Sequence, residues 1–241
     1  MTQPVRIAFY DFDGTLVSSN IVIRYASLVQ RLPSRPLALW KSVRLISSVP
    51  TYLLLDRFSR RLFNRVFFRD YRGLRRAWIE EQSEELFERV IRPAIHPGAL
   101  ELVEQDRREG FRVILVTGEI SSVLGPVARF FGFDGVVCNS LVFEKGVATG
   151  EVMPPLIAEG VKVQAMAKEC RDHRAELAQA KAYSDSFSDV PMLEAVGKPS
   201  AVNPDARLRK VAKLRGWPIL DLSRRGRSRP GVEQANHVHV P

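Results

Sequence analysis

A short apolar segment near the start of the chain ends in two aspartates separated by one residue. Residues 5–15 read Val-Arg-Ile-Ala-Phe-Tyr-Asp-Phe-Asp-Gly-Thr. In an extended segment residues i and i+2 face the same side, so Asp11 and Asp13 project together, about 6–7 Å apart, from the carboxyl end of a strand. Open α/β sheets keep their active sites at that end. Two carboxylates there repel each other unless a cation or a proton relieves them, so the segment predicts a divalent metal site or a pair of one nucleophile and one acid.

Beyond residue 97 the chain alternates between short apolar segments and amphipathic ones. The apolar segments predict strands at 112–116, 136–138, 180–183, 200–202 and 219–222. The amphipathic segments predict helices at 98–109, 123–131, 159–171, 190–196 and 205–216, with a hairpin over 141–152. Strands that alternate with helices form parallel sheets covered on both faces. We therefore expect an α/β fold with a Rossmann-like doubly wound parallel sheet.

The segment between the first strand and this alternating region has the pattern of helices. Residues from about 21 to 90 are dominated by Leu, Phe, Arg and Glu and carry few strand signals. We therefore expect a discontinuous core over residues 1–17 and 96–222, with an α-helical cap over 18–95 inserted into it. Residues 223–241 are rich in Arg, Gly and Pro and are expected to form a disordered basic tail.

Composition limits the remaining possibilities. The chain has 241 residues, 45% of them hydrophobic, enough for one substantial core and a smaller module. Its two cysteines, Cys138 and Cys170, are too few for a disulfide framework, and each is expected to be a buried thiol. This cysteine usage and the lack of a recognisable signal peptide favour a cytoplasmic location.

The net charge of +9 comes mostly from the predicted cap, where residues 18–100 hold 15 Lys and Arg against 7 Asp and Glu. Such a field attracts phosphorylated metabolites, acidic lipid surfaces or nucleic acid. No zinc-finger spacing, RNA-binding aromatic signature or helix-turn-helix pattern accompanies it, so specific nucleic-acid binding is not expected. Residues 37–55 are the most apolar part, interrupted by Lys41, Arg44 and Pro50. We expect a pair of core helices there, with an interfacial, lipid-facing segment as the alternative.

Three further polar signals follow predicted core strands or open core helices. Thr117 and Gly118 follow the second predicted strand, Lys162 opens a helix, and Asp185 and Asp189 follow the strand at 180–183. A hydroxyl and free N–H groups at a strand-to-helix turn suit a phosphate oxygen. Taken singly, each signal has a simpler explanation, because Thr117 and Asp189 could cap helices and Lys162 could be a surface lysine.

These signals, joined to Asp11 and Asp13 in this order, resemble the motifs of the haloacid dehalogenase superfamily. The resemblance covers residues 5–222 and is closest to the phosphoserine-phosphatase-like subgroup, subfamily IB. That subgroup has a helical cap between its first and second motifs, and its last motif, Asp-x-x-x-Asp, is followed by Pro-Met-Leu or a similar stretch. Here residues 185–193 read Asp-Ser-Phe-Ser-Asp-Val-Pro-Met-Leu.

The resemblance implies a magnesium-dependent phosphomonoester hydrolase that forms an aspartyl-phosphate. Asp11 would be the nucleophile, and Asp13 would protonate the leaving oxygen and then activate water. Mg²⁺ would be held by Asp11, by Asp185 and by the main-chain carbonyl of Asp13. Dehalogenases of the superfamily lack the second aspartate, so its presence favours a phosphatase.

The resemblance also implies which groups bind and support the transferred phosphoryl group. Thr117, Gly118 and Lys162 would contact its oxygens and offset their charge. Asp189 would orient Lys162 or metal-bound water. Thr15 and Ser188 would also lie behind the groups that react and support them. Ser188 occupies a position where the subgroup often carries Asn.

Two departures bear on the substrate. Phosphoserine-specific members use a Glu soon after the first motif and an Arg in the cap, whereas ungapped matching places Asn20 and Phe63 at those positions. A charged ligand would lack its partners there. The cap is also unusually apolar and Arg-rich, which favours a small or amphiphilic phosphomonoester, including a lysophospholipid-like one, and a transient contact of the basic cap with a membrane surface. A phosphoserine phosphatase proper, a phosphotransferase and a catalytically silent basic binding protein remain alternatives, and the oligomeric state stays open.

Overall fold

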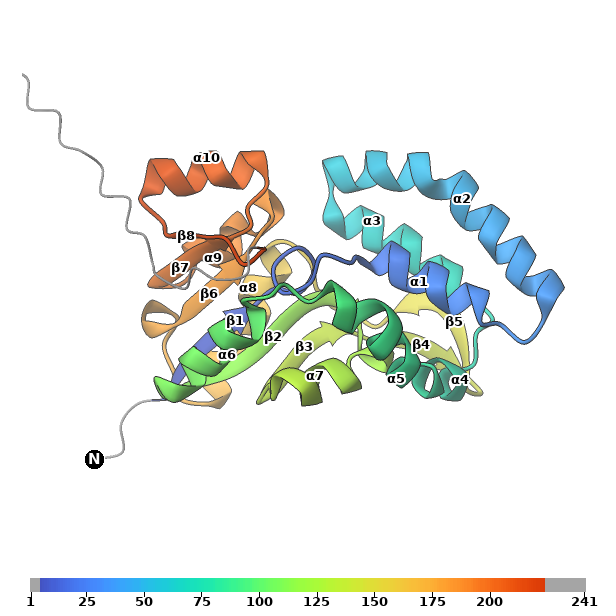
Figure 1. Ribbon diagram of the computed structural model, residues 1–241, viewed down its shortest axis with the longest axis horizontal. Helices are drawn as coiled ribbons and strands as arrows, with labels where there is room; N and C mark the ends of the chain where they lie inside the picture. Colours follow the sequence, from blue (N-terminus) through green and yellow to red (C-terminus); the bar gives the residue numbers. More distant parts are fainter. Residues whose placement is uncertain (1–4, 224–241) are drawn as a thin grey trace, which may run out of the picture.

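The computed structural model describes residues 5–223, and six parallel strands form its centre (Figure 1). Their order across the sheet is β3-β2-β1-β6-β7-β8, so the direction in which the chain adds strands reverses between β1 and β6. Open α/β sheets bind ligands at such a reversal. The expected doubly wound α/β fold is confirmed. The strands are β1 Arg6–Tyr10, β2 Phe111–Ile120, β3 Gly135–Asn139, β6 Lys181–Ser184, β7 Lys198–Val202 and β8 Ile219–Leu220.

The buried strands explain why helices cover both faces of the sheet. On β1, Ala8 and Tyr10 belong to one apolar cluster, while Ile7 and Phe9 belong to the other, because successive residues of a strand face opposite sides. The first cluster includes side chains of α6 and α7, and the second includes side chains of α8, α9 and α10. These helices are α6 Ala99–Arg108, α7 Gly125–Phe131, α8 Gly160–Asp172, α9 Val190–Glu194 and α10 Ala206–Arg215.

The expected helical segment follows β1 and gathers beside the sheet on the right of Figure 1. Two linkers join it to the core and run side by side, because Ser18 N–H donates to the carbonyl of Ala94 at 2.8 Å and His96 N–H donates to that of Leu16 at 2.9 Å. The segment's division from the core after residue 17 and before residue 96 stays a prediction. Its helices are α1 Ile21–Gln30, α2 Arg35–Phe58, α3 Arg60–Phe67, α4 Arg76–Glu81 and α5 Ser83–Leu86, with short 3-10 and π turns at 68–71 and 87–94.

The predicted hairpin is confirmed and packs against the helical segment. It consists of β4 Leu141–Glu144 and β5 Val147–Val152, paired antiparallel. Gly73 N–H donates to the carbonyl of Ala148 at 2.9 Å, and Ala148 N–H donates to that of Leu74 at 2.8 Å. The hairpin belongs to the part of the sequence that follows the cap, yet it packs against the cap helices.

The expected pair of core helices at 37–55 is wrong. A single helix of 24 residues, α2, occupies this segment, and its buried residues are Lys41, Leu45 and Tyr52. Pro50 lies inside it and is exposed, so the carbonyl of Ile46, which loses its helical partner to proline, can reach water. None of the helices described for residues 5–223 is both long enough and apolar enough to cross a membrane.

Smaller differences concern where elements end. Strand β2 continues beyond the predicted end at Val116 to Ile120, with a register shift in its pairing to β3 between these residues. The last part of the expected helical segment, residues 76–91, divides into α4, α5 and a π turn. Cys170 is buried and Cys138 only partly so, and both are free thiols. The predicted tail lies outside the described residues from 224 onward.

Candidate active site

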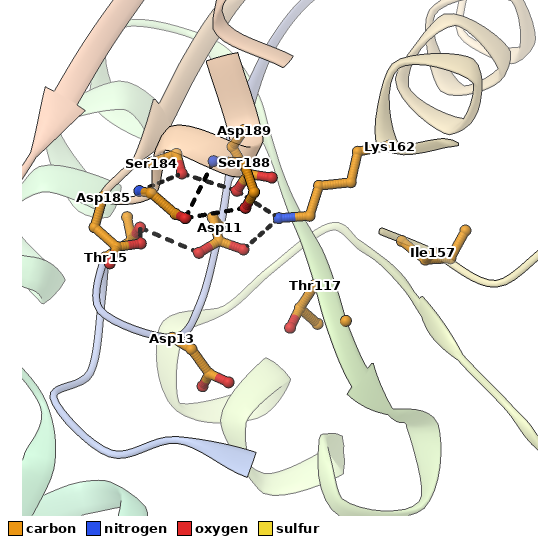
Figure 2. A network of polar contacts seen from close by, with 12 residues as sticks. Asp11, Asp13, Thr15, Thr117, Ile157, Lys162, Ser184, Asp185, Ser188 and Asp189 are labelled. Atoms are coloured by element: carbon orange, nitrogen blue, oxygen red, sulfur yellow. Dashed lines mark hydrogen bonds and ion pairs between the residues drawn. The ribbon is translucent and has the colours of Figure 1, made fainter. Parts of the chain in front are cut away.

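The ends of β1 and β6 bring together the carboxylates of Asp11, Asp185 and Asp189. Asp11 directly follows β1, and its N–H donates to the carbonyl of Tyr183 on β6 at 3.0 Å. Asp185 follows β6, and the Thr15 hydroxyl lies 3.3 Å from Oδ2 of Asp11 and 3.2 Å from Oδ1 of Asp185. Asp11 and Asp185 therefore approach one shared hydroxyl, as Figure 2 shows.

Gly14 allows this approach. Its φ is +82°, and a Cβ at this position would lie 2.0 Å from Oδ2 of Asp185. Residues with side chains rarely adopt such a φ. The loop carrying Asp185 is fixed from behind by Asp205, whose N–H donates to the Asp185 carbonyl at 2.8 Å. The Asp205 side chain also caps α10, as the sequence predicts, by accepting from the N–H groups of Arg207 and Leu208.

Lys162 joins two of these carboxylates. It lies in the first turn of α8, and its Nζ donates to Oδ1 of Asp11 at 2.6 Å and to Oδ2 of Asp189 at 2.7 Å. The Ser184 hydroxyl donates to the same Asp189 oxygen at 2.8 Å. Asp189 precedes α9 but makes no side-chain capping bond there. The interpretations of Asp189 as a helix cap and of Lys162 as a surface residue are therefore wrong, because both side chains are buried in one network.

The network carries an excess of negative charge. Burial raises the pKa of Asp11 to about 6, although the Lys162 ammonium opposes the shift. Burial, with the negative charges of Asp11 and Asp189, raises the pKa of Asp185 well above its usual value. Burial lowers the pKa of Lys162, but its two carboxylate partners raise it overall above that of an ordinary lysine. One ammonium thus stands against three carboxylates, of which Asp11 and Asp189 are buried and Asp185 is partly exposed. A further cation would relieve their repulsion.

A divalent metal fits this donor set. Carboxylate oxygens are the ligands that Mg²⁺ prefers, usually one or two per site together with waters and substrate oxygens. Within the described part of the chain, no group of three or more His, Cys, Asp or Glu side chains has the arrangement of a metal centre. A site between Asp11 and Asp185 would therefore have two carboxylates, with main-chain, water and substrate oxygens as the remaining ligands.

Asp13 is held by a buried arginine that sequence analysis missed. Nη2 of Arg24 donates to both carboxylate oxygens of Asp13, at 2.6 and 2.9 Å, and its Nε donates to Glu119 at 2.6 Å. Arg24 and Glu119 are fully buried, whereas the Asp13 side chain is partly exposed. Arg24 shares the buried side of α1 with Ile21, which is a signal that helical periodicity could have found.

The core side of the site contains the remaining predicted phosphate ligands. Asp11, Asp13, Lys162 and the loop after β6 line one pocket, and Thr117, Gly118 and Ser188 line it with them. Thr117 lies within β2 rather than at its end, and its Oγ1 accepts the N–H of Glu119 at 3.1 Å. The helix-cap interpretation of Thr117 is therefore wrong.

The cap side contains two residues that sequence analysis missed. Arg60 and Asn64 lie one turn apart on α3 and line the same pocket. Nδ2 of Asn64 is buried, and among residues 5–223 it has no hydrogen-bond partner. A buried amide without a partner is costly, so this atom is available to an acceptor in the pocket. An atom added at Gly118 would lie 2.8 Å from it.

The structure does not bring Asn20 and Phe63, the two predicted specificity residues, to the pocket lining. Asn20 is exposed and caps α1, where its side-chain oxygen accepts the N–H of Ile23 at 3.0 Å. Phe63 is buried and packs against the rings of Tyr52 and Phe67. Both have structural roles within the cap.

Cap and core also meet beside Lys162. Oε1 of Glu159 accepts from the Ser59 hydroxyl at 3.0 Å and from the N–H of Arg61 at 3.3 Å. Glu159 is the residue that precedes α8. We refer to these two hydrogen bonds as the cap–core contact.

Comparison with known proteins identifies the family and the fold. The profile of the haloacid dehalogenase-like hydrolases matches residues 8–194. A probable phosphatase of Mycobacterium tuberculosis is 32% identical over 222 residues, 90% of this chain and 75% of the relative. A phosphoserine phosphatase of the same organism is 30% identical over 240 residues, 95% of this chain and 75% of the relative. A crystal structure of a Bordetella pertussis protein of unknown function has a TM-score of 0.79 at 25% identity, over 91% of this chain and 100% of that one.

Proposed function

The chain belongs to the haloacid dehalogenase-like hydrolases, and from this premise we propose that it hydrolyses phosphomonoesters through a phosphoaspartate at Asp11, with Mg²⁺ as cofactor. The observation that carries the proposal is the buried contact of Lys162 with Asp11 and Asp189 beside Asp185. Carboxylate and ammonium groups do not enter a protein interior without a specific role or partner. Mg²⁺, held by Asp11, Asp185 and the Asp13 carbonyl, would supply positive charge to the phosphoryl oxygens.

In the first step an oxygen of Asp11 attacks phosphorus. The new P–O bond to Asp11 forms as the bond to the leaving oxygen breaks, and Asp13 gives its proton to that oxygen. Lys162 and the Thr117 hydroxyl neutralise the phosphoryl oxygens as the charge redistributes. Arg24 holds the Asp13 side chain in place through its contacts with both carboxylate oxygens.

In the second step water hydrolyses the intermediate. Asp13, now ionised, accepts a proton from the water, whose oxygen attacks phosphorus, and the bond between phosphorus and Asp11 breaks. Inorganic phosphate and the original Asp11 carboxylate are the products. Lys162 remains beside Asp11 and disperses the returning negative charge, while Asp189 holds the ammonium in position.

The cap over residues 18–95 selects the substrate in this proposal. Arg60 and Asn64 present a guanidinium and an unpaired amide to the pocket. They suit a phosphomonoester whose leaving group carries hydrogen-bond acceptors or negative charge near the scissile bond. Phosphoserine is a poor substrate, because Asn20 does not line the pocket and no acidic residue takes its place on the cap side of the lining to bind an ammonium among the described residues. A small or amphiphilic ester, including a lysophospholipid-like one, is the preferred substrate class.

Substitution of the nucleophile tests the proposal. Asp11→Asn should abolish hydrolysis of a chromogenic phosphate monoester in Mg²⁺, and a chelator should abolish it in the unaltered protein. The control is Asp172→Asn, which changes an exposed carboxylate at the end of α8. Acid quenching with a labelled substrate should trap phosphate on the unaltered chain and none on Asp11→Asn.

Other outcomes would contradict the proposal in distinct ways. An absence of turnover in every variant and with every ester of a phosphometabolite panel would favour a catalytically silent binding protein. Transfer of the phosphoryl group to an added alcohol in preference to water would favour a phosphotransferase. High activity on phosphoserine with none on long-chain phosphates would contradict the substrate class.

A further inference from the structure

Helix α2 runs along the outer edge of the cap (Figure 1), and its outward side carries exposed apolar residues. Leu39, Val43, Ile46, Pro50 and Leu53 recur every three or four residues and lie on one side, and all five are exposed. Ile46 and Leu53 are 70% and 69% exposed. Surface helices normally carry polar residues on the side facing water. This face is therefore available to an apolar partner.

Basic groups flank the apolar face. Residues 35–58 contain four Lys and Arg but only one acidic residue. Arg44 lies between this face and the buried side of α2, with its guanidinium 5.6 Å from the ring centroid of Trp40. Trp40 is itself exposed, and tryptophan is enriched where an apolar phase meets water. The apolar strip thus ends in a tryptophan and an arginine side by side.

Arg44 also lines a concave surface that is rich in arginine. Arg44, Arg65, Arg69 and Arg72 line it together with residues 150–152, and Glu151 is the acidic member of the lining. Arg44 pairs with Asp70 at 2.7 Å. Arg65 and Arg69 are exposed and have no ion pair with any residue between 5 and 223. We call this surface the arginine pocket.

We propose that the outer face of α2 and the arginine pocket dock the protein on an anionic lipid membrane. An amphipathic helix in this position lies in the plane of the interface with its apolar side chains among the acyl chains. Flanking arginines then reach the lipid phosphates, which they bind through two parallel N–H donors. A second copy of the chain fits the surface less well, because it would bring the same positive groups against these.

Vesicle sedimentation with the full chain tests the proposal. The protein should sediment with vesicles made of phosphatidylcholine and phosphatidylglycerol in equal parts, and only weakly with phosphatidylcholine alone. Raising the salt from about 0.1 M to about 1 M shortens the Debye length from about 10 Å to about 3 Å. Binding should fall with it but not vanish, because the apolar contact persists.

Two pairs of variants separate the apolar and the charged contributions. Ile46→Gln with Leu53→Gln should weaken binding at least about tenfold, because each lost apolar side chain removes a substantial transfer free energy. The matched control is Leu214→Gln, since Leu214 is 87% exposed on α10 in the core. This control should bind like the unaltered protein.

Arg65→Ala with Arg69→Ala should weaken binding to the anionic vesicles roughly 20- to 30-fold, at about fivefold for each basic residue. Arg209→Ala with Lys210→Ala removes two exposed basic residues from α10 and is the control for net charge. Circular dichroism and hydrolysis of a soluble phosphate ester should be unchanged in all four variants, which shows that they fold.

Three results would overturn the proposal. The first is equal binding to neutral and anionic vesicles, and the second is equal loss in the α2 variant and the Leu214→Gln control. The third is a stable dimer in sedimentation equilibrium that the α2 substitutions dissociate, with no vesicle binding at any salt concentration. That result would assign the face to a second copy of the chain.

Discussion

Replacement of Gly14 by alanine tests whether Asp185 belongs to the reaction centre. Gly14 has a φ of +82°, and a Cβ there would lie 2.0 Å from Oδ2 and 2.4 Å from Cγ of Asp185. Gly73 has a φ of +85°, but a Cβ there would meet no heavy atom within 4 Å. Both substitutions carry the same left-handed backbone cost of about 1–2 kcal/mol. Only Gly14→Ala also displaces Asp185.

The displacement can be sized from the structure. Ordinary contact with a Cβ begins at 3.4 Å, so Oδ2 must retreat from 2.0 Å to that distance, by about 1.4 Å. A misplacement of about 1 Å in a reacting arrangement costs roughly 10²-fold in rate. We therefore expect Gly14→Ala to lower kcat/KM at least roughly 100-fold and to raise the Mg²⁺ concentration needed for half-maximal activity. Gly73→Ala should leave both near their original values.

Two measurements on both variants decide the outcome. Urea denaturation gives the free energy of unfolding, which should fall in both variants and further in Gly14→Ala, because the clash with Asp185 adds to the shared backbone cost. Hydrolysis of a chromogenic phosphate monoester across a Mg²⁺ series gives kcat/KM and the metal requirement. The reasoning is refuted if Gly14→Ala unfolds like Gly73→Ala and still keeps the original kcat/KM and metal requirement.

Three further predictions concern Lys162, Asn64 and His96. Lys162→Met should abolish hydrolysis and lower the free energy of unfolding by about 3–5 kcal/mol, because it leaves buried carboxylates without their positive partner. Lys168→Met, on the exposed side of the same helix, should change neither quantity, and similar losses in both variants would contradict the assignment. Asn64→Leu should raise the free energy of unfolding by about 1–3 kcal/mol by removing an unpaired buried amide, yet raise KM, and an unchanged KM would exclude its contact with substrate. Burial lowers the pKa of His96, so the unfolded chain binds the proton first as the pH falls below about 6.5. Denaturation curves should show stability declining toward pH 5, and His96→Gln should flatten that decline.

Local patterns made the core of this site predictable. Asp11 and Asp185 each follow a buried parallel strand, and the ends of adjacent strands meet at one edge of the sheet. Lys162 occupies the first turn of a helix that the apolar periodicity predicts. Strand alternation and helix periodicity depend on neighbouring residues only, and a single sequence contains both.

Long-range pairing set the limit of prediction. Arg24 pairs with Glu119, 95 positions away in the sequence, and no feature of the sequence near either residue indicates the other. The prediction that Asn20 and Phe63 determine specificity has a different limit, because counting along a sequence does not fix which side of a helix faces the core. Phe63 lies beside Asn64 on α3, yet it points into the aromatic cluster of the cap while Asn64 lines the pocket.

Apolar content alone cannot distinguish a buried helix from one whose apolar side faces out of the protein. The sequence therefore predicts core helices where the structure has α2. Its buried side contains Lys41, whose Nζ donates to the carbonyl of Asp70 at 2.7 Å and to that of Arg72 at 3.0 Å. Its outer side contains Ile46 and Leu53. This exposure of apolar residues opposite a buried lysine follows from the fold of the cap around α2 and cannot be read from α2 alone.

The cap–core contact has a consequence for the order of events in a catalytic cycle. Glu159 accepts hydrogen bonds from Ser59 and Arg61 of the cap, and Lys162 follows it three residues later in the first turn of α8. Any separation of the cap from the core has to break these two hydrogen bonds, which lie three residues from the lysine that contacts Asp11. The opening of the pocket and the position of Lys162 therefore depend on the same short stretch of backbone.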